Sequence, residues 1–182
     1  MAMTLLTGGA RSGKSALAAR LGEAWSGSVA FVATAEALDD EMRERIARHR
    51  RSRPASWTTI EQPVALAEAV KAVPPGDLVI ADCLTLWVSN LFERGCGPTE
   101  IEERAAVAAR VAGERSGPTV VITNEVGSGI VPGDPSTRGY RDALGAVNML
   151  FARAARRAFV VVAGRAVPLP GDEEVFGDVL DG

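Results

Sequence analysis

One eight-residue segment constrains the fold more than any other part of the sequence. Residues 8 to 15 read Gly-Gly-Ala-Arg-Ser-Gly-Lys-Ser and match the pattern GxxxxGK[ST] at every required position. The apolar run Met3–Thr7 ends where this segment begins, and a helical pattern starts at Lys14. In a strand–loop–helix unit of this kind, backbone N–H groups surround phosphate oxygens at the positive end of the helix. The segment therefore predicts a site for a nucleoside triphosphate.

Two side chains of this loop have separate expected roles. Lys14 should reach the β- and γ-phosphates, and the Ser15 hydroxyl should bind Mg²⁺. A metal ion held in this way also needs a carboxylate from the end of another strand, and Asp82 ends the apolar run Leu78–Asp82. An Asp that caps a helix after a strand is also common, and that role does not exclude the first. We expect Ser15 and Asp82 as metal ligands and the loop as the nucleotide-binding segment: Gly8, Gly9, Ala10, Arg11, Ser12, Gly13, Lys14 and Ser15.

Apolar, β-branched runs recur along the chain, and helical patterns separate them. The runs are continuous, as in strands buried on both faces: Met3–Thr7, Val29–Thr34, Leu78–Asp82, Thr119–Thr123 and Phe159–Ala163. The helical patterns cover Lys14–Trp25, Leu38–Arg51, Val64–Val73, Glu100–Arg115 and Thr137–Arg157, and the short piece Trp57–Ile60 suits a sheet edge. The alternation predicts a single α/β domain over residues 1–182, with a P-loop NTPase-type, mostly parallel sheet flanked by helices. Strand order is left open, and the acidic tail 172–182 is expected to fray.

Composition restricts the partners and the compartment. The net charge of −3 gives no reason to expect nucleic acid or an anionic membrane as a partner. No apolar run approaches the length of a membrane span. Cys83 and Cys96 lack metal-site or CxxC spacing and fit a reducing compartment. We therefore expect a cytoplasmic protein.

The only histidine, His49, lies on a patterned helix. Leu38, Met42 and Ile46 recur every four residues, and His49 follows Ile46 by three, so it should face the protein body. A hydrogen-bonded histidine at the edge of the core satisfies this pattern. A nucleophile or acid–base group also satisfies it, because Arg50, Arg51 and Arg53 could hold a polyphosphate nearby. Spacing does not decide between the two.

Several segments taken together identify a family resemblance. They are residues 7–15, Ala33-Thr34, residues 39–42, Arg45-Ile46, His49, Arg53-Pro54, Trp57, residues 82–91 (DCLTLWVSNL), residues 123–132 (TNEVGSGIVP), Arg138, residues 140–142, Gly145 and Asn148. The sequence resembles the bifunctional adenosylcobinamide kinase / adenosylcobinamide-phosphate guanylyltransferase family of cobalamin biosynthesis. The resemblance extends from Thr7 to about Gly164. The phosphate loop alone is generic, whereas the NEVGxGIVP segment and the histidine-bearing helix are specific.

The resemblance implies two reactions with GTP and ATP as substrates and Mg²⁺ as cofactor. A triphosphate first phosphorylates adenosylcobinamide, and GTP then transfers GMP to the adenosylcobinamide phosphate, with release of pyrophosphate. A histidine carries the GMP in between, and by position it is His49, with Lys14 as the second catalytic residue. A homotrimer is also implied. The nucleotide site implied beyond the loop comprises Ala33, Thr34, Ala35, Arg50, Arg51, Ser52, Arg53, Glu61 and Asp82.

A second group of polar residues is a candidate for the substrate side. Asn124 and Glu125 leave a strand end, where open α/β sheets place their ligands. Arg138 and Arg141 could contact substrate phosphate or another subunit, and a solvated helix face explains them equally well. Two other functions stay open: a different small-molecule kinase, which needs no histidine nucleophile, and a GTP-dependent switch. The switch usually carries an [NT]KxD segment, which is not found in this sequence.

Overall fold

A seven-stranded sheet forms the centre of the molecule. The computed structural model describes residues 3–172 and 174–176, so the expectation of a frayed tail falls mainly on residues outside this part. The strands are β1 (Met3–Thr7), β2 (Val29–Ala33), β3 (Thr58–Glu61), β4 (Leu78–Asp82), β5 (Thr119–Ile122), β6 (Arg157–Val162) and β7 (Arg165–Leu169). Their spatial order is β3-β2-β4-β5-β1-β6-β7. All neighbouring pairs are parallel except β6 with β7, which confirms the mostly parallel α/β architecture.

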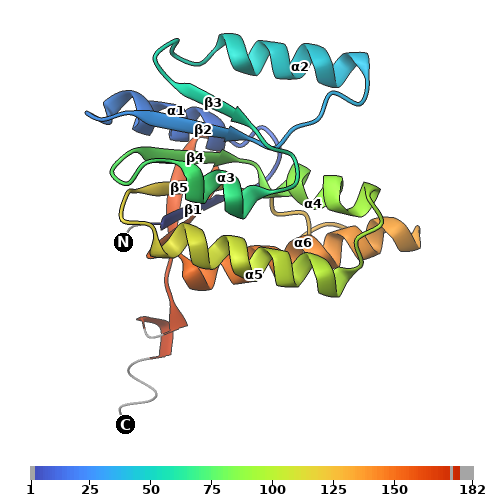
Figure 1. The fold of residues 1–182 in the computed structure, drawn as a ribbon. Coiled ribbons are helices and arrows are strands. Elements are labelled where there is room, and N and C mark those ends of the chain that lie inside the picture. The colour runs from blue at the N-terminus through green and yellow to red at the C-terminus, as the bar shows by residue number, and fades with distance from the viewer. Residues whose placement is uncertain (1–2, 173, 177–182) are drawn as a thin grey trace.

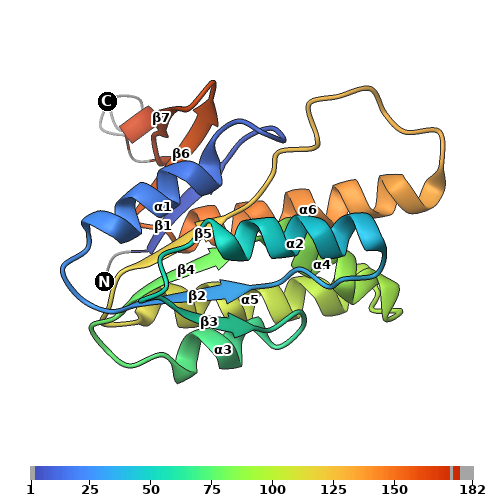
Figure 2. The same cartoon turned by 90° about the horizontal axis from the view of Figure 1, so that it is seen from above.

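Helices cover both faces of the sheet (Figures 1 and 2). They are α1 (Lys14–Ala24), α2 (Asp40–Arg51), α3 (Leu66–Ala72), α4 (Leu84–Glu93), α5 (Pro98–Glu114) and α6 (Pro135–Ala154). The sequence patterns predicted all of them except α4, and they did not predict β7. In α4 the N-cap Cys83 makes no side-chain capping bond, and five of ten residues are buried, so neither a start signal nor a polar face marks this helix.

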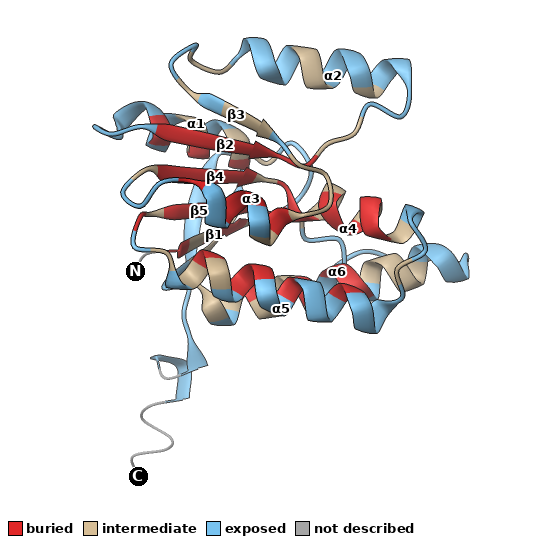
Figure 3. Ribbon diagram, viewed as in Figure 1, coloured by how far each residue is buried: buried red, intermediate tan, exposed pale blue. Residues whose placement is uncertain are grey.

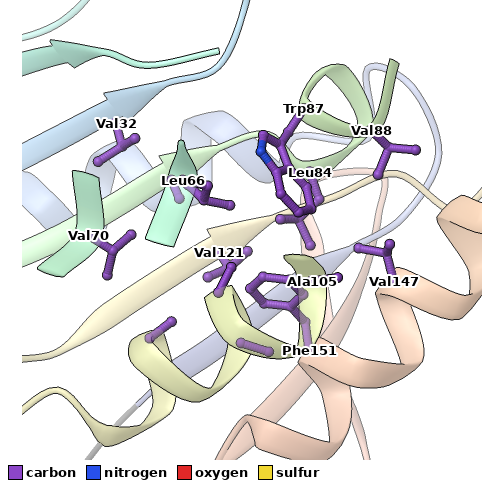
Figure 4. Close-up of a cluster of buried hydrophobic side chains, with 14 of the residues drawn as sticks. Val32, Leu66, Val70, Leu84, Trp87, Val88, Ala105, Val121, Val147 and Phe151 are labelled. Atoms are coloured by element: carbon purple, nitrogen blue, oxygen red, sulfur yellow. The ribbon is translucent and has the colours of Figure 1, made fainter. Parts of the chain in front are cut away.

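Side chains of alternate residues in the central strands pack into two hydrophobic cores, one on each face of the sheet. On one face Leu5 and Val32 pack with residues of α3, α4, α5 and α6, around the large side chains Trp87 and Phe151 (Figure 4). On the other face Leu6 and Phe31 join a smaller core beneath α1. Because both faces are covered, β2 and β5 are buried along their whole length, as Figure 3 shows. This double burial explains why the strands read as continuous apolar runs.

Helix α2 is placed differently from the others. It lies beyond β3, set off from the sheet (Figure 1), and it has no buried residue. The Asp39 carboxylate caps its start by accepting a hydrogen bond from the Met42 N–H at 2.7 Å. In the described part of the chain no helix has the length and apolarity needed to span a membrane.

Candidate active site

The loop between β1 and α1 turns at two glycines that tolerate no side chain. Gly8 and Gly13 have φ values of 141° and 102°, which L-residues with a Cβ rarely adopt. A Cβ on Gly8 would lie 2.4 Å from the carbonyl oxygen of Val161. The Gly164 N–H donates to the Ser12 carbonyl at 2.8 Å. The loop is thus supported from behind by the β6–β7 hairpin, and the start of α1 is left directed at the carboxyl end of the sheet.

Lys14 is held inside this loop. Its side chain is 6% exposed, and Nζ donates to the carbonyls of Gly8 at 2.8 Å and Gly9 at 2.7 Å and to Ser12 Oγ at 3.2 Å. Burial lowers the pKa of the ammonium group, and the nearby Asp82 and Cys83 act in the opposite direction. The Lys14 ammonium, a compact cation, is therefore held at the loop that we expect to bind phosphate oxygens.

Ser15 and Asp82 meet at the same edge of the sheet. The Ser15 hydroxyl donates to Asp82 Oδ2 at 2.9 Å. Burial raises the pKa of the Asp82 carboxyl; the Ser15 hydrogen bond and the nearby side chains of His49, Arg53 and Lys14 lower it. These three predicted site residues line the same cavity as the Asp82 carboxylate. An oxygen pair of this type is what Mg²⁺ prefers, and among the described residues no group of three or more acidic, His or Cys side chains is assembled to hold a metal by itself.

A cavity of about 330 Å³ opens in front of the phosphate loop and contains His49 in its wall. His49 shares that wall with Met42, Arg45 and Ile46, so the helical spacing identified the correct face of α2. Two details of the prediction are wrong: His49 is expected to face the protein body rather than solvent but is exposed, and Leu38 lies before the helix with 73% of its surface exposed. The residues that line the cavity are Ala10 to Ala16, Phe31, Ala33, Ala35, Met42, Arg45, Ile46, His49, Arg53, Asp82, Cys83, Leu86, Ile122 and Asn124.

Of the residues predicted to bind nucleotide at positions 50 to 53, not all line the cavity. Only Arg53 reaches the cavity wall. Arg50 is exposed and pairs with Glu61 at 3.2 Å, while Arg51 and Ser52 are exposed at the end of α2 and do not line the cavity. The Arg53 guanidinium lies 3.7 Å above the centre of the Phe31 ring, and Phe31 in turn stacks on Trp57. This aromatic support, which no sequence pattern predicted, aims one arginine at the site.

The predicted nucleotide-binding segment 33–35 also lines the cavity only in part. Ala33 and Ala35 line the cavity, whereas Thr34 is completely buried and does not. Cys83 lines the cavity too, but burial raises the pKa of its thiol to about 11. A buried thiol with a raised pKa fits a packing residue rather than an activated thiolate.

Asn124 stands between the phosphate loop and Asp82, because β5 lies between β1 and β4 in the sheet. Its N–H donates to Thr85 Oγ1 at 2.9 Å, and its carbonyl accepts from Asn148 Nδ2 at 3.0 Å. The neighbouring Glu125 N–H donates to the Gly8 carbonyl at 3.1 Å. The backbone is thereby fixed on both sides, and Asn124 lines the cavity.

The other candidates for the substrate side do not line the cavity. The Glu125 side chain is exposed and accepts a hydrogen bond from Gly127 N–H in its own loop. Arg138 donates to the carbonyls of Pro132 and Gly133, and Arg141 pairs with Asp142. Sequence reasoning missed Phe31, Leu86 and Ile122, which are ordinary core residues in pattern. It also did not assign Arg45 to the site, although this residue shares the face of Met42 and His49 by helical spacing.

The chain is similar to known proteins over most of its length. Residues 4–169 match the model of a family described as cobinamide kinase / cobinamide phosphate guanyltransferase. The bifunctional adenosylcobalamin biosynthesis protein CobP of Pseudomonas aeruginosa is 40% identical over 170 residues, covering 92% of this chain and 97% of that protein. The bifunctional adenosylcobalamin biosynthesis proteins CobU of Escherichia coli and Salmonella typhimurium are each 39% identical over 181 residues, covering 92% of this chain and 99% of those proteins. The chain therefore belongs to the cobinamide kinase / cobinamide phosphate guanyltransferase family.

Proposed function

We propose that this chain catalyses two consecutive reactions on adenosylcobinamide. In the first, a nucleoside triphosphate, ATP or GTP, transfers its γ-phosphoryl group to the aminopropanol hydroxyl. In the second, GTP transfers GMP to the resulting phosphate, which gives adenosylcobinamide-GDP and pyrophosphate. Membership of the family supports both reactions. The observation that carries the proposal is the single cavity whose wall contains Lys14, Ser15, Asp82 and His49.

The phosphate side of this cavity suits a triphosphate with its metal. We assign the backbone N–H groups of Gly8 to Ser15 and the Lys14 ammonium to the phosphate oxygens. The Ser15 hydroxyl and the Asp82 carboxylate, 2.9 Å apart, would hold Mg²⁺, with the remaining ligands from phosphate and water. Bound there, the ion would neutralise charge on the transferring group. Arg45 and Arg53, which line the same cavity, add positive charge next to the nucleotide.

His49 accounts for the second reaction. An imidazole nitrogen attacks the α-phosphorus of GTP, the bond to the bridging oxygen breaks, and pyrophosphate leaves with the electron pair. An oxygen of adenosylcobinamide phosphate then attacks the same phosphorus, and the phosphorus–nitrogen bond breaks, which returns the electron pair to the ring. Two in-line displacements replace one direct transfer between anionic partners. The exposed position of His49 on the cavity-facing side of α2 supports access to the ring from the nucleotide side.

Asn124 is our candidate for contact with the acceptor substrate. It lines the cavity, and two hydrogen bonds hold its backbone in place. Glu125, Arg138 and Arg141 remain candidates for the approach of the corrinoid or for subunit contacts. A homotrimer remains a prediction, which sedimentation equilibrium of the purified protein would test.

The proposal is tested by following both products. Purified protein is incubated with adenosylcobinamide, GTP and Mg²⁺, and the corrinoids are identified by mass spectrometry. We expect adenosylcobinamide phosphate first and adenosylcobinamide-GDP later, and the His49→Ala variant should stop at the phosphate. A wild-type protein that forms no GDP derivative, or a His49→Ala variant that forms it at the wild-type rate, would contradict the proposal.

A further inference from the structure

Thr34 is bound to the end of β4 by three hydrogen bonds. Its hydroxyl donates to the Cys83 carbonyl at 2.7 Å and accepts from the Cys83 N–H at 2.8 Å. Its own N–H donates to the Asp82 carbonyl at 3.1 Å. With 0% of its surface exposed, Thr34 has no side-chain atom available for a ligand. Its contacts are directed at the backbone that carries the Asp82 carboxylate.

Asn90 of α4 fixes Thr34 from the opposite side. Its side chain is buried, with 4% of the residue exposed. The amide nitrogen donates to the Thr34 carbonyl at 2.7 Å and to the Pro63 carbonyl at 3.0 Å, so both N–H bonds are used. Thr34 is therefore held between α4 and β4, and a shift of its backbone would be transmitted to Asp82.

We propose that Thr34 and Asn90 are positioning residues that set the place of the Asp82 carboxylate for Mg²⁺. The inference rests on the proposed metal role of Asp82. Mg²⁺ demands nearly ideal octahedral geometry with short bonds to oxygen, so its binding is sensitive to small displacements of a ligand. Groups that orient metal ligands from behind often contribute 10–100-fold to metal affinity, in order of magnitude.

Two substitutions at Thr34 distinguish the effect of its hydroxyl group from the effect of its side-chain shape. Thr34→Val keeps the branched side chain but leaves the Cys83 N–H and carbonyl without their partner in a buried place, where such groups are costly. The end of β4 should then move toward other partners. Thr34→Ser retains the hydroxyl and should retain the position of Asp82.

The test measures how strongly Mg²⁺ improves nucleotide binding, without turnover. The dissociation constant of a GTP analogue with a methylene bridge between the α- and β-phosphates is determined by calorimetry in EDTA and in Mg²⁺. We take the ratio as the dissociation constant in EDTA divided by that in Mg²⁺. For Thr34→Val we expect this ratio to fall by about tenfold, while the dissociation constant in EDTA changes little. Thr34→Ser should keep the wild-type ratio, and Asn90→Ala should lower it in the same direction, which preserves the test if Thr34→Val does not fold.

Thr119→Val is the matched control. Thr119, at the start of β5, is also a fully buried threonine, but its hydroxyl has no hydrogen-bond partner among the described residues, so its loss should leave the ratio unchanged. A wild-type ratio in both Thr34→Val and Asn90→Ala would overturn the inference. An equal loss of binding in EDTA and in Mg²⁺ would also overturn it, because the defect would not concern the metal. If the Asp82→Asn variant has the wild-type ratio, the proposed metal role of Asp82 is contradicted, and with it the basis of the inference about Thr34 and Asn90.

Discussion

The Ser15 hydroxyl donates a hydrogen bond to the Asp82 carboxylate at 2.9 Å and so joins the first turn of α1 to the end of β4. Sixty-seven positions separate these two residues in the sequence. Their oxygens meet because the carboxyl ends of β1 and β4 lie at the same edge of a parallel sheet. Lys14, Arg53 and His49 line the same cavity as this pair, and their charges lower the pKa of Asp82, against the larger effect of burial.

Replacing Asp82 by Asn should stabilise the protein when it is studied without nucleotide or Mg²⁺. Burial raises the folded-state pKa of Asp82, so ionisation costs stability, and this cost appears as the pH rises through the folded pKa. Asp82→Asn should therefore melt above the wild type at pH 7.5, by roughly 2–4 °C for each kcal/mol gained. The difference should shrink as the pH falls toward the unfolded-state value of about 3.9. Calorimetric melting of both proteins across this range checks the prediction; a variant that melts lower at pH 7.5 would contradict it.

Lys14→Arg should impair both reactions, because both need the same triphosphate in place. The ammonium fits among two carbonyls and one hydroxyl within 3.2 Å, whereas a planar guanidinium is larger and differently shaped. We expect kcat to fall by about 100-fold or more for each reaction. The matched control is Lys71→Arg, since Lys71 is exposed and outside the cavity. Full activity of Lys14→Arg in either reaction would argue against a shared phosphate loop.

The phosphate loop and the framework around it could be predicted from the sequence, and the arrangement of the cavity could not. Gly8 to Ser15 carries its own conformational signals, and strands buried on both faces produce apolar runs that are visible without a structure. The fully buried Thr34 and the support of Arg53 by Phe31 arise from contacts between distant elements. The spacing of residues within one segment of the sequence does not predict contacts between distant elements. For His49 the helical period gave the correct face, but not its exposure, because α2 stands off the sheet.

Removing the ring beneath Arg53 should weaken nucleotide binding without altering the charge of the site. Phe31→Leu keeps an apolar side chain but loses the face on which the guanidinium rests at 3.7 Å. A cation–π contact of this kind contributes about 0.5–1 kcal/mol, so KM for GTP should rise by about two- to fivefold. Phe159→Leu serves as control, since Phe159 packs against the same core. Equal KM values for the two variants would contradict a role for the Phe31 ring.

Gly8→Ala should strongly destabilise the fold, whereas Gly9→Ala should not. The new Cβ at position 8 would meet the Val161 carbonyl at 2.4 Å, in a backbone conformation with φ 141°. At position 9 a methyl group would have no atom within 4 Å from any described residue other than its chain neighbours. We expect a loss of about 2 kcal/mol or more for Gly8→Ala, measured by urea unfolding. Similar unfolding midpoints for the two variants would show that the β6–β7 hairpin yields to the methyl group.

The role of His49 as carrier of the GMP group is measured most directly by labelling the protein with GTP that is radioactive at the α-phosphate. The protein is incubated with this GTP and Mg²⁺ in the absence of corrinoid. His49 is the only histidine in the chain, so an acid-labile, alkali-stable phosphoramidate on histidine can form nowhere else. We predict such a label on the wild-type protein and none on His49→Ala. Equal labelling of the two proteins would contradict this role of His49.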